Sequence, residues 1–436
     1  MPDAGAVAGP DTIYAVSTGP GTAAVAVIRV SGPSAWETLA TLAGDVPSVR
    51  RAVVRELKHD GEILDQALVI AFAENASFTG ERMVEFQCHG GRAVVSGIMD
   101  ALDALGGRVA EPGEFTRRAV LAGRMDLLVA EGLGDLVAAE TAVQRRQALR
   151  AMASPMTQRL DTWRTSLIEA RALLEVTIDW ADEEVPEDAS PEVSRLIDDV
   201  MAGMTAELKG AAAAERLRQG YEVAIIGAPN VGKSSLLNAI AGREAAIVSD
   251  IPGTTRDVIE VRYDLDGLPV TFLDTAGLRD TDDAIEAEGV RRAMARAEGA
   301  DLRVLLRSAD TDADPKVFPE NCEMTVWTKA DVLPVPGVTS IAARTGQGLD
   351  ALLSAISSRL AENAAWAGML GHRRQSDAVR AALDHLSHCR QLLDQGDIEA
   401  RAEDLRLAVA ALDRLTGRLA VEDMLDVVFG RFCLGK

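Results

Sequence analysis

Cysteine and long apolar runs are both scarce in this chain of 436 residues, and each scarcity excludes a class of protein. The four cysteines, Cys88, Cys322, Cys389 and Cys433, are widely spaced without a CxxC pair, which argues against a disulfide framework or a zinc module. No apolar run approaches the ~20 residues that span a bilayer, and the N-terminus has neither the basic segment nor the apolar stretch of a signal peptide. We therefore expect a cytoplasmic protein with no membrane partner.

Positive charge is also in short supply, because 45 Lys and Arg residues face 67 Asp and Glu residues and leave a net charge of −22. Surfaces that bind nucleic acid are usually basic, so this protein would need a local basic patch or a partner to hold RNA. One candidate patch combines Arg145, Arg146 and Arg150 on a predicted helix with Arg117 and Arg118 upstream. Pairing of these arginines with surface carboxylates is the alternative that we favour.

The sequence pattern changes three times along the chain and indicates an α+β multidomain protein. The first part alternates short apolar runs with Gly-rich turns, which is typical of strands. The strands expected there are 24–30, 67–72 and 83–87, with a helix at 95–105. Helix-period patterns then cover 126–180 and 192–217 around an acidic loop at 179–188, and they return beyond residue 361. The stretch from 221 to about 360 alternates strand-like and helix-like segments, as βα units do.

A helical region interrupted in this way predicts that one domain is inserted into a loop of another. Such an insertion requires the two ends of the insert to lie close together. The expected domains are an N-terminal α/β domain at 1–122, the first part of a helical domain at 123–217, an inserted α/β domain at 218–362, and the second helical part at 363–436.

The inserted domain begins with a phosphate-binding loop, Gly227-Ala-Pro-Asn-Val-Gly-Lys-Ser-Ser235, which matches GxxxxGK[ST] between a strand at 223–226 and a helix at 235–241. Its glycines let backbone N–H groups wrap around phosphates, and the helix N-terminus faces the same anion. Lys233 would neutralise β- and γ-phosphate oxygens, and the Ser234 hydroxyl would ligate Mg²⁺. The nucleotide-binding residues expected in this loop are Asn230, Val231, Gly232, Lys233, Ser234 and Ser235.

Two segments downstream are typical of the switches of a nucleotide hydrolase. Thr255, in Gly-Thr-Thr-Arg-Asp at 253–257, would complete the Mg²⁺ shell and contact the γ-phosphate. Asp274 follows an apolar strand at 270–273 and would hold Mg²⁺ through water, and the Gly277 N–H would contact the γ-phosphate. The nucleotide-binding residues expected from these segments are Ser249, Thr254, Thr255, Asp274, Thr275, Ala276 and Gly277.

Two later segments resemble guanine-reading loops and favour GTP over ATP. Asp331, in Thr-Lys-Ala-Asp at 328–331, can accept hydrogen bonds from two guanine donors that adenine lacks. Thr328 replaces the usual Asn of this NKxD motif, so discrimination would fall to Asp331. The usual Ser-Ala pair of the last guanine loop is replaced by two alanines. The residues expected to bind the base are Thr328, Lys329, Asp331, Ala342 and Ala343.

The group that orients the attacking water is not obvious from these motifs. Ras-type enzymes place a Gln directly after the Asp-Thr-Ala-Gly segment, but Leu278 stands there and cannot position water. Another polar group must replace it, or the chain is only a slow switch. The acidic candidates that follow are Asp280, Asp282, Asp283, Glu286 and Glu288, and a solvated loop carboxylate is the alternative for each.

Several distant segments together resemble the bacterial tRNA-modification GTPase family MnmE, also called TrmE. They include the phosphate loop, the run 243–257 and Leu-Asp-Thr-Ala-Gly-Leu-Arg at 273–279. The chain ends in Phe432-Cys-Leu-Gly-Lys436, which is similar to the C-terminal Cys-[Ile/Leu/Val]-Gly-Lys signature of that family. Segments 27–32, 77–81, 89–91 and 111–117 also resemble it, so the resemblance covers nearly the whole chain.

The resemblance implies an N-terminal α/β tetrahydrofolate-binding domain, a central helical domain, and a Ras-like P-loop G domain inserted into it. It implies a flavoprotein partner, the FAD protein MnmG (GidA), and tRNA as substrate of the complex. Together the two proteins would add an aminomethyl or carboxymethylaminomethyl group to C5 of the wobble uridine. The one-carbon donor would be 5,10-methylene-tetrahydrofolate, with a 5-formyl analogue as a second possible ligand. A homodimer is also implied, in which the G domains pair across K⁺ and hydrolysis needs no arginine finger.

Residue roles follow from the same resemblance. Asn230 matches the potassium ligand of the phosphate loop, and the backbone carbonyls of Ser249, Ile251 and Thr254 match the other K⁺ ligands. Such a cation would supply the charge that an arginine finger supplies elsewhere. Glu286 matches the glutamate that orients the catalytic water.

Folate binding is implied at four positions. These are Arg29, Glu85, Arg124 and Lys436. The acidic group suits the pterin ring of folate, and the basic groups suit its glutamate tail. Cys433 matches a thiol at the modification site, and a buried cysteine beside Phe432 is the alternative.

Three other interpretations remain open at this point. A ribosome-assembly GTPase would usually append an RNA-binding module or a second G domain, and neither a KH-like GxxG loop nor a second GKS occurs here. A scaffold timed by GTP is a further possibility, which the dependence of tRNA modification on GTP turnover would test. His385, His388 and Cys389 share one helical face and could bind a metal, but without a fourth ligand we expect an ordinary solvated helix.

Overall fold

The computed structural model describes residues 11–153, 155–179, 190–228, 230–243, 245–247, 260–274, 296–308, 322–333, 335, 337–364, 367–392, 397–419, 425, 428–430, 432 and 435. Contacts divide the chain into two compact units. The first comprises Met1–Gly134 with Asp413–Lys436, and the second comprises Asp135–Leu412. Each unit is described by itself.

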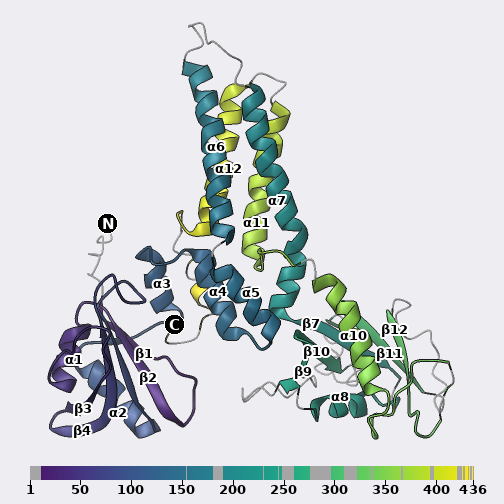
Figure 1. The fold of residues 1–436 in the computed structure, drawn as a ribbon, viewed down its shortest axis with the longest axis horizontal. Helices are drawn as coiled ribbons and strands as arrows, with labels where there is room; N and C mark the ends of the chain where they lie inside the picture. The colour runs from purple at the N-terminus through teal and green to yellow at the C-terminus, as the bar shows by residue number, and fades with distance from the viewer. Residues whose placement is uncertain are drawn as a thin grey trace, which may run out of the picture. The chain divides into compact units, whose positions relative to one another are not determined.

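A six-stranded sheet in the order β3-β4-β5-β2-β1-β6 forms the centre of the first unit (Figure 1). Its strands are β1 (Ile13–Val16), β2 (Ala23–Ser31), β3 (Val53–His59), β4 (Glu62–Phe72), β5 (Met83–Gly90) and β6 (Arg108–Val109). Neighbours pair antiparallel except for β1 and β6, which are parallel. The three strands expected from the sequence lie within β2, β4 and β5, so these predictions are confirmed.

Both faces of this sheet are covered, but by different elements. Helices α1 (Ala35–Ala43) and α2 (Arg92–Ala104) pack on one face, where Leu39 and Leu102 join Tyr14 and Phe86 in the main core. Because side chains alternate along a strand, Ile13 and Ala15 of β1 face the other way. They pack there with Phe115 of α3 (Glu114–Leu121). The next helix, α4 (Leu127–Ala138), begins in this unit and supplies Leu127 to a cluster with Leu425 and Phe429.

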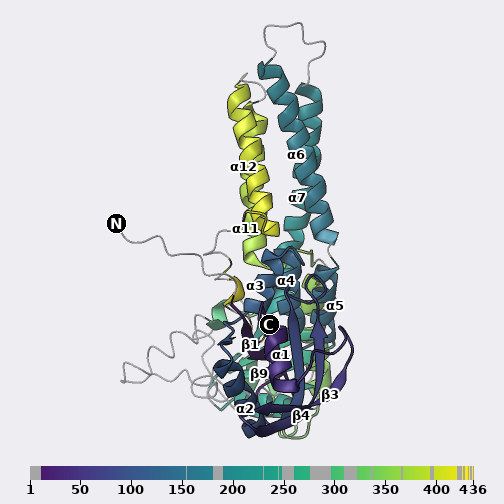
Figure 2. The ribbon, with the colours of Figure 1, turned by 90° about the vertical axis from the view of Figure 1, so that its left-hand side faces the viewer.

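Long helices dominate the start and end of the second unit. They are α5 (Ala142–Met152), α6 (Pro155–Asp179), α7 (Ser190–Gln219), α11 (Arg373–Gln391) and α12 (Ile398–Thr416), whose last turn belongs to the first unit. Helix α7 packs against α6 and α11, and the two views show these helices running side by side (Figures 1 and 2). No helix in the described ranges is long and apolar enough to cross a membrane.

The second sheet lies between the two halves of this helical region in the sequence. Its order is β12-β11-β7-β10-β9-β8. The first four strands pair in parallel, and the pairs β10–β9 and β9–β8 are antiparallel. The elements are β7 (Tyr221–Gly227), α8 (Lys233–Ala241), β8 (Ala246–Ile247), β9 (Glu260–Leu265), β10 (Leu268–Asp274), β11 (Leu302–Ser308), β12 (Met324–Thr328) and α10 (Leu349–Ala364). The strands expected at 223–226 and 270–273 lie within β7 and β10. An α/β sheet thus interrupts the helical pattern, and the exact domain boundaries stay predictions.

Two tight hairpins use the same residue pair. Asp60-Gly61 joins β3 to β4 and Asp266-Gly267 joins β9 to β10, and all four residues have positive φ values. That conformation is required by the type I′ turn that matches the twist of the paired strands. A Cβ on Gly267 would also lie 2.7 Å from the Val143 side chain of α5, so this hairpin lies directly against the helical part of the unit.

Candidate functional site

The phosphate-binding loop joins the end of β7 to the start of α8. Gly232 is the N-cap of α8 with φ +105°, and Asn230 has φ +63°. Gly232 relieves the backbone strain that a side chain would suffer at this angle. The loop follows the carboxyl end of a parallel strand and precedes a helix N-terminus, which is where open α/β sheets bind phosphates.

Lys233 lies inside this loop, with only 7% of its surface exposed. Its Nζ donates hydrogen bonds to the carbonyl oxygens of Gly227 at 2.7 Å and Ala228 at 2.9 Å. Burial lowers the pKa of the ammonium, and the nearby carboxylate of Asp274 opposes this effect. A buried cation held by two neutral carbonyls is suited to receive an anionic ligand.

Ser234 and Asp274 form the metal side of the loop. The Ser234 hydroxyl donates to Oδ2 of Asp274 across 3.1 Å, and Asp274 is 6% exposed at the end of β10. A hydroxyl and a carboxylate at hydrogen-bond distance beside a phosphate loop fit the hard, oxygen-binding Mg²⁺ ion. The structure therefore brings together the two metal-side residues that the sequence predicted in separate segments.

The guanine-side loops meet the phosphate loop at the same edge of the sheet. Thr328 ends β12, and its hydroxyl lies 2.5 Å from the Val231 carbonyl oxygen in the phosphate loop. The following loop is joined to the Ala342 segment by the hydrogen bond from Ala330 N to Ile341 O. Lys329 has φ +59°, and Asp331 pairs with the exposed Arg344 at 3.3 Å. Hence the described parts of four predicted nucleotide segments converge.

A second group of predicted residues gathers on the first sheet. The antiparallel register places Arg29 of β2 opposite Glu85 of β5, and the guanidinium donates to Oε1 at 3.1 and 2.8 Å. Their side chains are only 18% and 16% exposed. The guanidinium carbon also lies over the rings of Phe78 and Phe115, at 5.4 and 5.7 Å from their centroids. Both charged groups therefore share the sheet face that α3 covers.

Two further parts of the first unit lie close to this sheet. Arg124 packs its aliphatic stem beside Gly80, since a Cβ there would be 3.4 Å from Cγ and Cδ of the arginine. Gly435 accepts a hydrogen bond from the Ser17 hydroxyl at 3.0 Å, and its φ is +88°. A Cβ on Gly435 would collide with the Val16 carbonyl oxygen, so only glycine allows this approach to the end of β1.

Comparison with known proteins covers almost the whole chain. The profile described as "GTP-binding protein TrmE N-terminus" matches residues 12–124, and the "MnmE helical domain" profile matches residues 127–433. The "tRNA modification GTPase MnmE" of Dinoroseobacter shibae is 51% identical over 98% of this chain and 100% of its own length. The chain belongs to the MnmE family. The Caulobacter vibrioides protein of the same name is 45% identical with the same coverage.

A solved structure of Era from Aquifex aeolicus, bound to GDP and aluminium fluoride, also resembles part of the chain. It is 28% identical and covers 31% of this chain and 56% of that one, with a TM-score of 0.26. The assignment to the MnmE family rests on the full-length relatives and the two profiles instead.

Several residues expected from the switch motifs or from the MnmE resemblance lie outside the described residues. They are Ser249, Ile251, Thr254, Thr255, Thr275, Ala276, Gly277, Glu286, Cys433 and Lys436. The water-orienting carboxylate, the terminal thiol and most of the K⁺ set therefore stay predictions, as do the acidic alternatives at 280–288. Asn230 is the one predicted potassium ligand within the described ranges.

The first unit contains an ion-pair network that the sequence analysis did not predict. Glu114 binds Arg108 at 2.7 Å and Arg118 at 2.9 Å, and Arg118 also binds Glu81 at 3.2 Å and Asp11 at 2.6 Å. Burial raises the pKa of Glu114, but Arg108, the Glu111 N–H and Arg118 outweigh it and leave that pKa low. Arg118 was one of the arginines that could contact tRNA phosphates. It pairs with carboxylates instead, which is the alternative that the sequence analysis favoured.

The other arginine patch and the possible metal site have different outcomes. Arg145, Arg146 and Arg150 are exposed on α5.

His388 and His385 lie against one buried carboxylate, Asp404 of α12, with Nδ1 at 2.6 and 3.4 Å from its oxygens. In the described part of the chain no group of three His, Cys, Asp or Glu residues is arranged to hold a metal. Burial raises the pKa of the adjacent Cys389 thiol to about 11, so it stays protonated.

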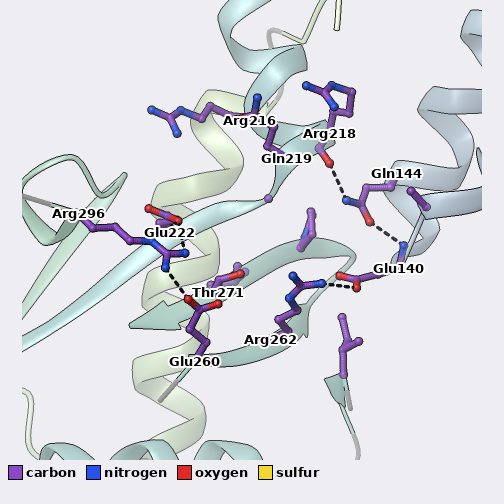
Figure 3. Close-up of a pocket in the computed structure, with 15 residues that line it drawn as sticks. Glu140, Gln144, Arg216, Arg218, Gln219, Glu222, Glu260, Arg262, Thr271 and Arg296 are labelled. Carbon is purple, nitrogen blue, oxygen red and sulfur yellow. Dashed lines mark hydrogen bonds and ion pairs between the residues drawn. The ribbon is translucent and has the colours of Figure 1, made fainter. Parts of the chain in front are cut away.

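A polar pocket of about 460 Å³ lies where the helical part of the second unit meets its sheet (Figure 3). It borders the amino-terminal ends of β7 and β10, opposite the edge that carries the nucleotide loops. Ion pairs close its walls, from Arg262 to Glu140 at 2.8 Å and from Arg296 to Glu222 at 2.7 Å. Since these side chains satisfy one another, the pocket is best explained as a polar junction between the helices and the G domain.

Proposed function

We propose that this chain hydrolyses GTP and couples that hydrolysis to modification of the wobble uridine in certain tRNAs. The observation that carries the proposal is the edge of the second sheet where the four predicted nucleotide-binding segments meet (the nucleotide edge). It occurs in a chain that matches a tRNA modification GTPase over 98% of its length. With an MnmG-type FAD protein, it adds an aminomethyl or carboxymethylaminomethyl group to C5. The one-carbon unit comes from 5,10-methylene-tetrahydrofolate.

The G domain supplies the binding of GTP. Lys233 exchanges its two carbonyl partners for phosphate oxygens, and the N-terminus of α8 supports the same negative charge. Ser234 would ligate Mg²⁺ and Asp274 would hold it through water, and the ion would supply positive charge beside the phosphates. Asp331 accepts hydrogen bonds from the guanine donors. To do so, its carboxylate must break its ion pair with Arg344 or use its other oxygen.

Hydrolysis itself depends on groups beyond the described ranges. Glu286 would orient the water that Leu278 cannot hold, and Asn230 with the carbonyls of Ser249, Ile251 and Thr254 would hold K⁺. This ion would supply positive charge for hydrolysis when the G domains of a homodimer pair. We therefore expect hydrolysis to be faster in potassium than in sodium salts.

The first unit supplies the one-carbon site. Arg29 and Glu85 are fixed to each other on one sheet face beside two aromatic rings, and Arg124 and the C-terminal tail are part of the same unit. A flat pterin that stacks on the partly exposed ring of Phe78 would present ring nitrogens to Glu85, and Arg29 would hold the carboxylate in place. A folate derivative is the ligand class that this combination fits best.

Purified full-length protein tests the enzymatic half of the proposal. GTP hydrolysis in Mg²⁺ with KCl should exceed that with NaCl, and Glu286→Ala should abolish turnover while GTP still binds. The neighbouring acidic residue offers a matched control, since Glu288→Ala removes the same charge and should keep the wild-type rate. Equal turnover in the wild type and Glu286→Ala would remove the assigned catalytic group, and absence of GTP binding by the wild type would contradict the proposal itself.

A further inference from the structure

Thr328 occupies a position where its side chain can join two loops of the nucleotide edge. It is the last residue of β12 and is 6% exposed. Its Oγ1 lies 2.5 Å from the Val231 carbonyl oxygen and 3.2 Å from the Arg307 carbonyl oxygen. Both partners are acceptors, so the threonine hydroxyl must be the donor.

The two carbonyls belong to different parts of the edge. Arg307 is in β11, the strand between β12 and β7. Val231 is in the phosphate loop that follows β7, two residues before Lys233, and is 1% exposed. A hydroxyl has only one proton to donate. The shorter distance assigns that proton mainly to Val231, and Arg307 takes the weaker share.

The carbon atoms of Thr328 also lie near the phosphate loop. A Cβ added to Gly232 would be 3.7 Å from Cβ and 3.9 Å from Cγ2 of Thr328, so a single methyl group would fill the space between the threonine and the loop. The direct contact between them is the hydrogen bond from the threonine hydroxyl. Directly after Thr328, Lys329 turns the chain at φ +59° toward Asp331.

We propose that Thr328 is a positioning residue that fixes the guanine-reading loop at a set distance from the phosphate loop. GTP must contact both loops at once, so a rigid spacing lowers the ordering cost of binding. Because the hydroxyl is committed to Val231, Thr328 does not read the base, and Asp331 carries the discrimination. This inference rests on the proposed GTP-binding function.

The decisive variant is Thr328→Val, which keeps the shape and removes only the donor. It leaves the buried Val231 carbonyl without its hydroxyl partner, so we expect GDP and GTP to bind roughly 10- to 100-fold more weakly. Thr328→Ser keeps the donor and should stay within about 3-fold of the wild-type affinity. Thr325→Val, at an exposed position of the same strand, is the matched control and should have no effect.

Three measurements on the full-length protein separate positioning from other roles. The dissociation constant and release rate of a fluorescent guanine nucleotide measure how much the hydrogen bond from Thr328 to Val231 contributes to nucleotide binding. The rate constant kcat at saturating GTP should be unchanged while KM rises, since Thr328 does not contact the reacting phosphate in this account. The ratio of GTP to ITP affinity should also be unchanged, because ITP lacks the amino group that Asp331 reads.

Each outcome supports or overturns the positioning role. Unchanged affinity in folded Thr328→Val, or weakening by Thr328→Ser equal to that by Thr328→Val, would overturn the inference. A fall in the GTP to ITP ratio would instead make Thr328 a base-reading residue. Thermal melting of the nucleotide-free variants checks that both are folded, and failure of the wild type to bind GTP would contradict the proposed function rather than this role.

Discussion

The two six-stranded sheets of this chain build their candidate sites in opposite ways. In the second sheet the candidate residues lie in the loop after β7 and at the carboxyl ends of β10 and β12, where hydrogen bonds join Ser234 to Asp274 and Thr328 to the phosphate loop. In the first sheet, whose neighbours are mostly antiparallel, the functional groups project from the strands themselves, with Arg29 and Glu85 meeting across a register pair. A parallel sheet gathers its loops at one edge, whereas an antiparallel pair places side chains opposite one another on a face.

This difference predicts that each site can be removed without the other. Lys233→Ala should lower kcat/KM for GTP by roughly 10²–10³-fold, because a buried charge that meets the phosphates is lost. Folate binding by the same protein, measured by calorimetry with a 5-formyl-tetrahydrofolate, should be unchanged. Lys209→Ala, at an exposed position of α7, is the control for loss of a lysine charge. Loss of folate binding in Lys233→Ala would show that the sites are not independent.

The ion-pair network should matter to the stability of the first unit more than to binding. Glu114→Gln breaks contacts to Arg108 and Arg118, and should lower the free energy of unfolding at pH 7 by about 3 kcal/mol. The pKa of Glu114 is lower in the folded than in the unfolded chain, where it is near 4.5. Its stabilising effect is therefore complete above that value and is lost as pH falls through the folded pKa.

Urea unfolding of the full-length protein between pH 3 and pH 7 measures this effect. A spectroscopic probe placed in the first unit reports the unfolding of that unit. The wild type should lose stability at the acid end, and Glu114→Gln should lose less over the same interval. Glu111→Gln, whose side chain is exposed, should behave like the wild type. An acid dependence that is identical in wild type and Glu114→Gln would exclude this carboxylate as its source.

Removal of the acidic group on the sheet face should be milder. Glu85→Gln leaves the largely buried Arg29 without its ionic partner and removes a charged acceptor for the ligand. We expect folate binding to weaken by about 10-fold or more, with GTP hydrolysis unaffected. Glu56→Gln, on the half-exposed edge strand β3, is the matched control. Equal folate affinity in the wild type and Glu85→Gln would remove Glu85 from the site.

The polar junction between the helices and the G domain should give the smallest effect. Arg262 and Glu140 have side chains 49% and 33% exposed, so their ion pair is well solvated. Arg262→Ala should change the free energy of unfolding by no more than about 1 kcal/mol and GTP turnover by less than about 2-fold. A much larger change in turnover would instead make this pair part of the catalytic coupling between the helices and the G domain.

The same contrast explains what the sequence could predict. The phosphate loop is contiguous and its glycines, lysine and serine have fixed spacing, so pattern alone located Lys233 and Ser234. Strands β2, β4 and β5 were also predicted, from short apolar runs that Gly-rich turns separate. The pairing of Arg29 with Glu85 depends on strand register across a separation of 56 residues, and only the resemblance pointed to both.

Other features had no local signal at all. The ion-pair network joins Asp11 to Arg118, which is 107 positions away, and the tie from Thr328 to Val231 spans 97 positions. At Thr328 the sequence showed only a departure from the usual Asn. The structure supplies a physical reason why a hydroxyl can stand there, because its donor reaches the phosphate loop directly.

The most direct test of the whole account is nucleoside mass spectrometry on tRNA from cells that lack this chain. The deletion strain should lose the C5-aminomethyl-type wobble nucleosides. Complementation with the wild type should restore them, and complementation with Glu286→Ala or Lys233→Ala should not. Persistence of these nucleosides in the deletion strain would contradict the tRNA-modification function, and their restoration by Glu286→Ala would contradict its dependence on GTP hydrolysis.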